Sequence, residues 1–267
     1  MLTFCFRAAL VPALLLALPA QAQLPTDSAT VPSRPEVALL ATDPTSACAH
    51  PFGLDVGQRR EYQLLDAKGK PVGSQRYQVV SLSTATAGKK KHPVAETVVH
   101  LKSGLYDATG HVQQQQDLTF RCRQDTVFTD GLAEINYDGL KSFRDRLFAY
   151  KGQALPWPCQ PTGGGPLPGG GAQVKVSSPS VAIASVSTTL RERRLRPGTT
   201  AVRVPAGTFN CFVVESVREL ATAARADLVL KTTGRQVDYY DPGVGIIKTE
   251  YFDKGTKLLQ SRELLKR

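Results

Sequence analysis

The chain has 267 residues, a formal net charge of +10, 42% hydrophobic residues and 7% aromatic residues. That length is enough for one domain, or at most two, with a sizeable core. A basic surface can meet anionic lipid, polysaccharide or nucleic acid, but the charges are scattered along the chain. The sparse aromatic residues are not interleaved with the basic ones, which argues against a nucleic-acid-binding platform.

The first 22 residues have the pattern of an export signal. Arg7 precedes an apolar run from Ala8 to Leu18, and Pro19-Ala20-Gln21-Ala22 offers small residues at a cleavage site. The run is shorter than the roughly 20 residues that span a bilayer, and no later segment spans one either. Cys5 precedes the run and so cannot carry a lipid at the cleavage site. We expect cleavage near Ala22 and a free periplasmic or secreted protein.

Residues 23–47 are rich in Pro, Thr, Ser and Ala and lack the period of a helix or a strand. They predict a flexible leader, followed by one β-rich domain over residues 48–267.

Short strands dominate the first half of that domain. A Gly-containing turn at Asp66–Lys70 separates the first two strands, and Asp107–Gly110 separates the next two. The predicted strands are Arg59–Leu65, Ser74–Ser83, Glu96–Ser103, His111–Arg123 and Thr126–Phe128. Lys89-Lys90-Lys91-His92 reads as a solvated hairpin tip, with a contact to an anionic surface as the alternative.

One segment breaks the strand pattern. Leu140, Phe143, Leu147 and Tyr150 recur at spacings of three, four and three residues, with charged residues between them. This stripe predicts a short amphipathic helix that packs on the sheet, with partner binding as the alternative.

The segment 156–171 contains eleven Gly or Pro among its sixteen residues. This density predicts a long surface loop, with Trp157 and Cys159 near its start. Its glycines lack the Lys-Ser or Lys-Thr of a phosphate-binding loop.

The second half returns to strands at short, regular spacing, which predicts an antiparallel β-barrel or half-barrel, similar in general shape to lipocalins and LolA. A sandwich is the alternative. The expected strands are Gln173–Ser177, Val181–Leu190, Thr200–Val204, Asn210–Leu220, Ala226–Thr232, Arg235–Tyr240, Gly245–Phe252 and Lys257–Leu265.

Four cysteines remain after signal cleavage, and an even number in an exported chain predicts up to two disulfides. Their spacing matches no compact zinc signature, and three connectivities stay open. The candidates are Cys48, Cys122, Cys159 and Cys211.

No catalytic or metal-binding motif stands out. His92, Glu96 and His100 would share a strand face, but four residues span about 13 Å, too far for one ion. Asp107 and His111 flank a turn and could touch, which is more typical of turn stabilisation than of acid–base catalysis. No G-x-S-x-G, H-E-x-x-H or dinucleotide fingerprint occurs. We therefore expect no catalytic residues, no metal and no cofactor.

Two blocks resemble the TapB-like family of exported proteins. They are Val204-Pro205-Ala206-Gly207-Thr208-Phe209-Asn210-Cys211-Phe212 and the stretch from Asp241 to Glu250 that contains Gly243 and Gly245. The order of Cys48, Gly57, Tyr62 and Asp66–Lys70, and then Cys122 and Phe128–Asp130, is also similar. The resemblance covers Cys48 to Leu265, while the Gly/Pro segment and Cys159 depart from it. It implies a β-rich, barrel-like exported domain and brings no catalytic residues.

The residues of these blocks have structural roles in our interpretation. Pro205 fixes φ, Ala206-Gly207 turns the chain, and Thr208-Phe209 restarts a strand with Phe209 plugging the sheet interior. Gly243 turns the chain toward the strand that begins at Gly245. Two functions remain as hypotheses: a non-enzymatic envelope protein that binds an apolar ligand or a protein partner on a curved sheet, and a hydrolase of envelope polymers with a dispersed Asp/Glu/His site.

Overall fold

The computed structural model describes residues 46–88, 93–143, 145–225 and 228–267, all within one compact unit, Leu40–Arg267. The predicted signal peptide, nearly all of the leader and the Lys89–His92 tip lie outside these residues. Two short helical elements, α1 (Ser46–Ala49) and the 3-10 helix η1 (Pro51–Gly53), come first. No helix in the described ranges has the length and apolar character to cross a membrane.

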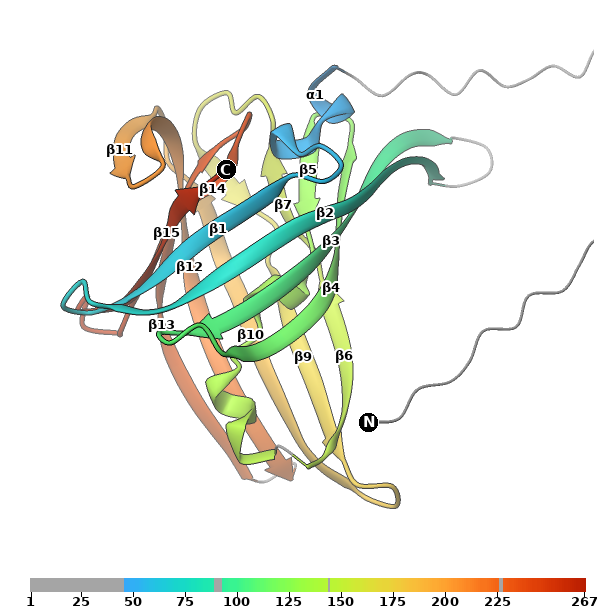
Figure 1. Cartoon of the computed structure of the whole chain (residues 1–267), viewed down its shortest axis with the longest axis vertical. Helices are drawn as coiled ribbons and strands as arrows, with labels where there is room; N and C mark the ends of the chain where they lie inside the picture. The colour runs from blue at the N-terminus through green and yellow to red at the C-terminus, as the bar shows by residue number, and fades with distance from the viewer. Residues whose placement is uncertain (1–45, 89–92, 144, 226–227) are drawn as a thin grey trace, which may run out of the picture. The chain divides into compact units, whose positions relative to one another are not determined.

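Fifteen strands among the described residues form a nearly closed antiparallel barrel (Figure 1), which confirms the predicted fold class. The strand order is β6-β9-β10-β12-β13-β14-β15-β1-β2-β3-β4-β5-β7, with β11 added to β12 and β8 added to β10. The strands are β1 Arg59–Asp66, β2 Pro71–Ala87, β3 Val94–Asp107, β4 Val112–Arg123, β5 Thr126–Thr129, β6 Leu147–Gln153, β7 Leu155–Pro158, β8 Gly165–Leu167, β9 Gly170–Ser177, β10 Ala182–Leu195, β11 Thr200–Val204, β12 Gly207–Arg225, β13 Leu228–Asp241, β14 Gly245–Phe252 and β15 Leu258–Lys266.

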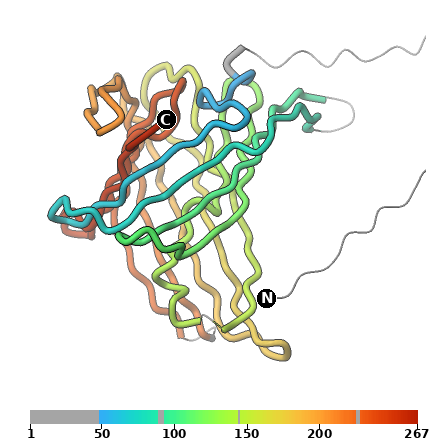
Figure 2. The backbone as a smooth tube through the Cα atoms, viewed as in Figure 1, coloured from blue at the N-terminus to red at the C-terminus, as the bar shows by residue number. Residues whose placement is uncertain are grey.

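Side-chain alternation places one face of each strand in the barrel interior. Tyr62, Tyr77, Leu101 and Leu118, on four neighbouring strands, belong to the main buried core. Two 3-10 helices, η2 (Gly131–Glu134) and η3 (Asp138–Phe143), help to enclose a second, smaller core against β9 and β10. The tube in Figure 2 shows these two turns, in yellow-green, lying beside the long strands of the second half.

The predicted amphipathic helix at 140–150 is wrong. The chain forms η3 up to Phe143 and then strand β6, whose residues pair with β9 from Leu147↔Ser177 to Gln153↔Gly171. A spacing of three residues also fits a 3-10 turn, so Leu140 and Phe143 do pack together on the second core. Leu147 is 58% exposed, so the stripe does not continue along one face. Pairing at the edge of the sheet overrides the helical pattern here.

The Gly/Pro segment also differs from its prediction, because short strands run through it. In β7, Trp157 is 1% exposed, and Pro156 pairs in register with Phe128 of β5. The carbonyl oxygens of Pro156 and Pro158 accept hydrogen bonds from Arg193 and Tyr240. These prolines therefore point their backbone groups away from β5, where a missing N–H removes no ladder bond.

The barrel closes where one stretch of chain changes its pairing partner. β6 pairs with β9 and β7 pairs with β5, and only Ala154 separates the two strands. The two ends of the sheet order are thus joined covalently at one corner. Gly131 packs against this corner so closely that a Cβ there would lie 2.0 Å from the carbonyl oxygen of Gly171 and 2.3 Å from that of Gln153.

We predict that Gly131→Ala lowers the free energy of unfolding by about 2–3 kcal/mol, because the added methyl must push apart backbone atoms that close the barrel. Urea unfolding followed by Trp157 fluorescence measures this change. The matched control is Gly165→Ala, where a Cβ meets nothing within 4 Å; its cost should stay within about 0.5 kcal/mol. Equal costs for the two variants would contradict the assigned role of Gly131.

Candidate functional site

A cleft of about 830 Å³ lies over the outer face of β1, β2, β3 and β4, which run side by side in Figure 1. Outward residues pair across these strands in two rows. One row is Arg59–Gln78–Lys102–Asp117, and the other is Glu61–Arg76–Gly104–Gln115. We call this region the outer cleft. Its volume lies within the range of typical ligand sites.

Cationic side chains outnumber acidic ones around the outer cleft. Glu61 and Asp117 are the two carboxylates, which leaves a formal side-chain charge of +4. The six cationic side chains are Arg59, Arg60, Arg76, Lys102, Lys266 and Arg267.

Two of these cations are already paired within the cleft. Nε of Arg76 lies 2.9 Å from Oε1 of Glu61, and Nζ of Lys102 lies 2.7 Å from Oδ1 of Asp117. Arg59 and Lys266 have no carboxylate within 4 Å among the described residues, so they are free to meet an anionic group.

The hollow of the cleft depends on a glycine in the middle of β3. Gly104 presents no side chain, and the ring of Tyr106 covers the space where its Cβ would lie, 2.8 Å away. The guanidinium of Arg76 stacks 4.3 Å from the centre of that ring. The floor therefore combines backbone, an aromatic ring and charge.

Side chains of the main core, in contrast, fill the barrel interior where this core lies. A cavity of about 30 Å³ lies beside Tyr62, Tyr77, Glu134 and Arg262. Such a space holds about one water molecule and no apolar ligand.

A chain of polar contacts occupies much of that interior. Arg262 of β15 donates to Oε1 of Gln75 at 2.9 Å and to Oγ1 of Thr249 at 3.1 Å. The Thr249 hydroxyl donates to Asp238 at 2.8 Å, and the amide of Gln236 donates to Asp238 at 3.0 Å. The same amide lies 3.4 Å from Glu134 of η2, at the outer limit of a hydrogen bond. We call these six residues the interior network.

Burial raises the pKa of Asp238 from 3.8 to about 6, and the nearby Glu134 carboxylate adds to the increase. Hydrogen bonds from Thr249 and Gln236 and the charge of Arg262 oppose it. Asp238 and Glu134 are therefore acidic groups that converge, but they do so in a closed interior with no room for a polymer.

The residues singled out in the first motif block form a hairpin. β11 and β12 pair from Thr200↔Cys211 to Val204↔Gly207, so Pro205 and Ala206 make the turn. The N–H of Ala206 donates to the carbonyl of Leu264 at 3.2 Å, and Phe209 is buried in the main core. Thr208 pairs with Arg203 in the ladder.

The second block is also a turn. The N–H of Gly243 donates to Oδ1 of Asp241 at 2.8 Å, and β14 begins at Gly245. Gly245 has φ +97°, and a Cβ there would lie 3.1 Å from the ring of Phe52 and from the guanidinium of Arg60. Arg60 in turn donates to the carbonyls of Phe52 and Val244.

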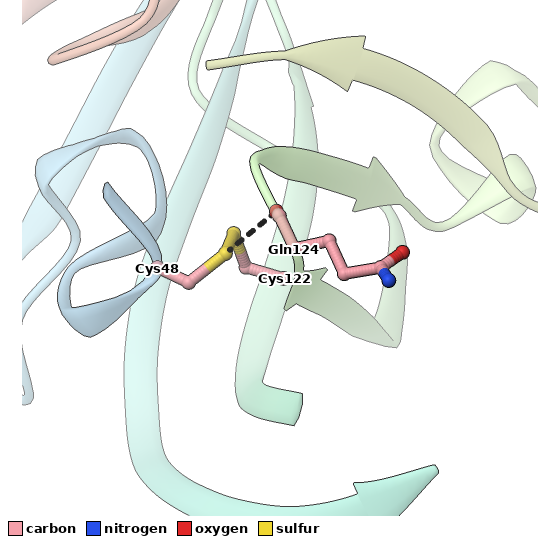
Figure 3. Close-up of a disulfide and its surroundings, with 3 residues drawn as sticks. All are labelled: Cys48, Cys122 and Gln124. Atoms are coloured by element: carbon pink, nitrogen blue, oxygen red, sulfur yellow. Dashed lines mark hydrogen bonds between the residues drawn. A yellow bond between two sulfur atoms is a disulfide. The ribbon is translucent and has the colours of Figure 1, made fainter. Parts of the chain in front are cut away.

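Among the four cysteines in the described ranges, Cys48 and Cys122 form a disulfide with an S–S distance of 2.00 Å (Figure 3). Cys159 and Cys211 are free, so two of the four candidates are not bonded. The disulfide ties α1 to β4.

The other polar candidates do not assemble into a site. Glu96 forms an ion pair with Arg121 at 2.9 Å, and Nδ1 of His100 lies 3.4 Å from the Thr119 hydroxyl. His92 lies outside the described residues. Asp107 and His111 do touch at 3.7 Å, where Asp107 accepts the N–H of His111 and so closes the turn.

A family model described as DUF3108-like matches residues 55–265. The chain belongs to the DUF3108-like family. The finer TapB-like resemblance stays a prediction. None of the curated proteins matches the chain.

Two solved structures share the fold. One is a putative lipoprotein from Parabacteroides distasonis ATCC 8503, with a TM-score of 0.63 and 19% identity, covering 81% of this chain and 98% of that one. The other is a putative exported protein with a YmcC-like fold from Bacteroides fragilis NCTC 9343, with a TM-score of 0.58 and 17% identity, covering 82% and 99%. At this identity, the likeness shows the fold alone.

The sequence left both the outer cleft and the interior network unpredicted. The available signals were weak: Gly104 at an outward strand position with Tyr106 two residues later, and Gln236 and Asp238 at inward positions of β13. The residues that complete each site come from distant parts of the chain.

We predict that the buried carboxyl of Asp238 makes stability depend on pH. Between about pH 4 and 6, the folded protein holds a proton that the unfolded chain has lost, so this group lowers the free energy of unfolding as pH rises. In the Asp238→Asn variant, the free energy of unfolding should therefore fall by about 1–3 kcal/mol less over this pH range than in the unsubstituted protein. Urea unfolding at several pH values between 4 and 7 tests this.

The matched control is Asp138→Asn, which changes an exposed carboxylate paired with Lys141. It should leave the pH profile parallel to that of the unsubstituted protein. If the Asp238 variant is also parallel, the proposed source of the pH dependence is wrong.

Proposed function

We propose that this protein is an exported, non-enzymatic binding protein of the cell envelope, and that its outer cleft binds an acidic segment of a partner protein. The observation that carries the proposal is a large cleft with a cationic surplus on the outside of a barrel whose interior is filled. The solved structures with this fold, described as a putative lipoprotein and a putative exported protein, support placement in the envelope.

A polypeptide fits the outer cleft better than a uniformly anionic polymer does. Glu61 and Asp117 neutralise Arg76 and Lys102, so a chain of like negative charges would find few free cations, whereas a peptide can place acids near Arg59 and Lys266 and neutral groups elsewhere. The Tyr106 ring and the Arg76 guanidinium stacked on it together offer a surface for an aromatic side chain. The occupant we propose is therefore an extended segment of mixed acidic and aromatic composition.

The apolar-ligand version of the hypothesis has less support, because the interior cavity of about 30 Å³ is too small for such a ligand. The hydrolase alternative requires carboxylates that converge where a substrate can reach them. Glu134 and Asp238 converge only inside the barrel, and Asp117 in the outer cleft is held by Lys102. These observations favour binding over hydrolysis.

The first prediction concerns the positive charge of the outer cleft and uses a variant with two charge reversals, Arg59→Glu with Lys266→Glu. It should weaken binding of a fluorescein-labelled peptide of alternating glutamate and tyrosine by about tenfold or more at low salt, because two attractive contacts become repulsive. Fluorescence anisotropy at about 50 and 150 mM salt measures the affinity, and the difference should shrink as screening increases.

The control is Lys151→Glu with Lys175→Glu, which makes the same change in net charge at exposed positions of β6 and β9. Its affinity should stay within about threefold of the unsubstituted protein. If both double variants lose affinity equally, the loss comes from the change in net charge alone, and the outer cleft is not the binding site. Tighter binding to heparin or to anionic lipid vesicles than to the peptide would reject the polypeptide partner.

A second prediction keeps the charge constant. Gly104→Gln displaces the Tyr106 ring, because its Cβ would lie 2.8 Å from that ring, so it should weaken binding of the same peptide by about tenfold with little change in its salt dependence. Circular dichroism checks that the fold is retained. Unchanged affinity in a folded Gly104→Gln protein would show that the peptide does not enter the cleft.

A further inference from the structure

Three cysteine sulfur atoms meet near the turn between β4 and β5, where β7 ends. The Sγ atoms of Cys48, Cys122 and Cys159 all lie within 4.8 Å of one another. Two of them form the disulfide, and the third is a free thiol that is partly exposed. A free thiol is therefore held next to a disulfide, which is the arrangement that thiol–disulfide exchange requires.

The backbone holds Cys159 in this place. Cys122 pairs with Val127 across β4 and β5, and Val127 pairs with Trp157 across β5 and β7. Two residues later, the N–H of Cys159 donates to the carbonyl of Asp125 at 2.8 Å, in the turn between β4 and β5. The approach of the third sulfur thus follows from the pairing of three strands.

We propose that Cys159 exchanges with the Cys48–Cys122 disulfide, so that this cluster is a built-in thiol–disulfide exchange site. The Cys159 thiolate attacks Sγ of Cys122, a Cys122–Cys159 bond forms, and the Cys48–Cys122 bond breaks. Cys48 leaves as a thiolate and takes up a proton from water, which replaces the proton that Cys159 lost. The step involves no net oxidation or reduction and needs no other reactant.

The carbonyl oxygen of Gln124 can stabilise the Cys48 thiol once that thiol has been released and protonated. It lies 3.6 Å from Sγ of Cys48 (Figure 3), so the released thiol can donate a hydrogen bond to it. Exchange moves the crosslink from α1–β4 to the segment that follows β7. Cys48 then becomes the free thiol, and α1 is no longer tied to the sheet.

The surroundings of Cys159 keep the exchange slow at neutral pH. Burial raises the pKa of this thiol, the nearby Asp125 carboxylate raises it further, and a backbone hydrogen bond from Val127 opposes them. Tyr240, whose hydroxyl donates to the carbonyl of Pro158, and Arg193, which stacks on Trp157, face the same region. Because the thiolate is the attacking species, the rate should rise about tenfold per pH unit below this pKa.

The experiment incubates the oxidised protein without reductant at pH 6, 7.5 and 9, blocks free thiols under acid, and digests with pepsin. Mass spectrometry then identifies the linked cysteine pairs. We expect a Cys122–Cys159 pair that appears faster as pH rises, together with blocked Cys48. Cys159→Ser should retain only Cys48–Cys122. Cys211→Ser is the matched control, since it removes the other free cysteine, and it should behave like the unsubstituted protein.

A second variant covers the case in which exchange is too slow to detect. Cys48→Ser leaves Cys122 and Cys159 as thiols, and oxidised glutathione should join them within the folded protein. The chain has a single tryptophan, Trp157, two residues from Cys159, whose fluorescence should change as the bond forms. Thiols that stay separate in folded Cys48→Ser would overturn the proposal. A Cys48–Cys159 pair as the sole new product in the unsubstituted protein would overturn the choice of leaving group.

Discussion

The buried guanidinium of Arg262 constrains the whole barrel, because a charge in the interior must be met by polar partners. Its contacts to Gln75 and Thr249, and the onward contacts to Asp238 and Glu134, join β2, β13, β14, β15 and η2 in the interior network. The outer surface, in contrast, carries a cleft of about 830 Å³ over β1 to β4.

A second constraint acts at the corner where the barrel closes. β6 and β7 are one stretch of chain with two pairing partners, and this change of partner leaves β7 beside β5 rather than in a free loop. The same pairing carries Cys159 to the disulfide that holds α1 on β4. Closure of the barrel and the meeting of three sulfur atoms thus have a common structural cause. A shift of β7 by one residue would turn Trp157 out of the core and separate the thiol from the disulfide.

The sequence predicted the strands well where alternation and turn residues agree. The turn residues Asp66–Lys70 connect β1 to β2, and Asp253-Lys254-Gly255 separates β14 from β15. The prediction was wrong where a local pattern fits two structures. The stripe from Leu140 to Tyr150 fits a helix, but strand pairing makes it a 3-10 turn followed by a strand. The outer cleft and the interior network could not be predicted from the sequence, because the register between distant strands brings Lys266 beside Glu61 and Arg262 beside Gln75. Periodicity reports which face a residue occupies, but not which distant strand it will lie against.

The most distinctive motif of the chain bears on function through this architecture. The Pro205-Ala206 turn hydrogen-bonds the carbonyl of Leu264, and the guanidinium of Arg267 stacks 4.6 Å from the centre of the Phe209 ring. The hairpin of β11 and β12 therefore fixes the end of β15, where Lys266 and Arg267 border the outer cleft. Loss of this hairpin would release two of the cations that distinguish the cleft from an ordinary sheet surface. A motif without catalytic residues in this way positions two cationic side chains at the outer cleft.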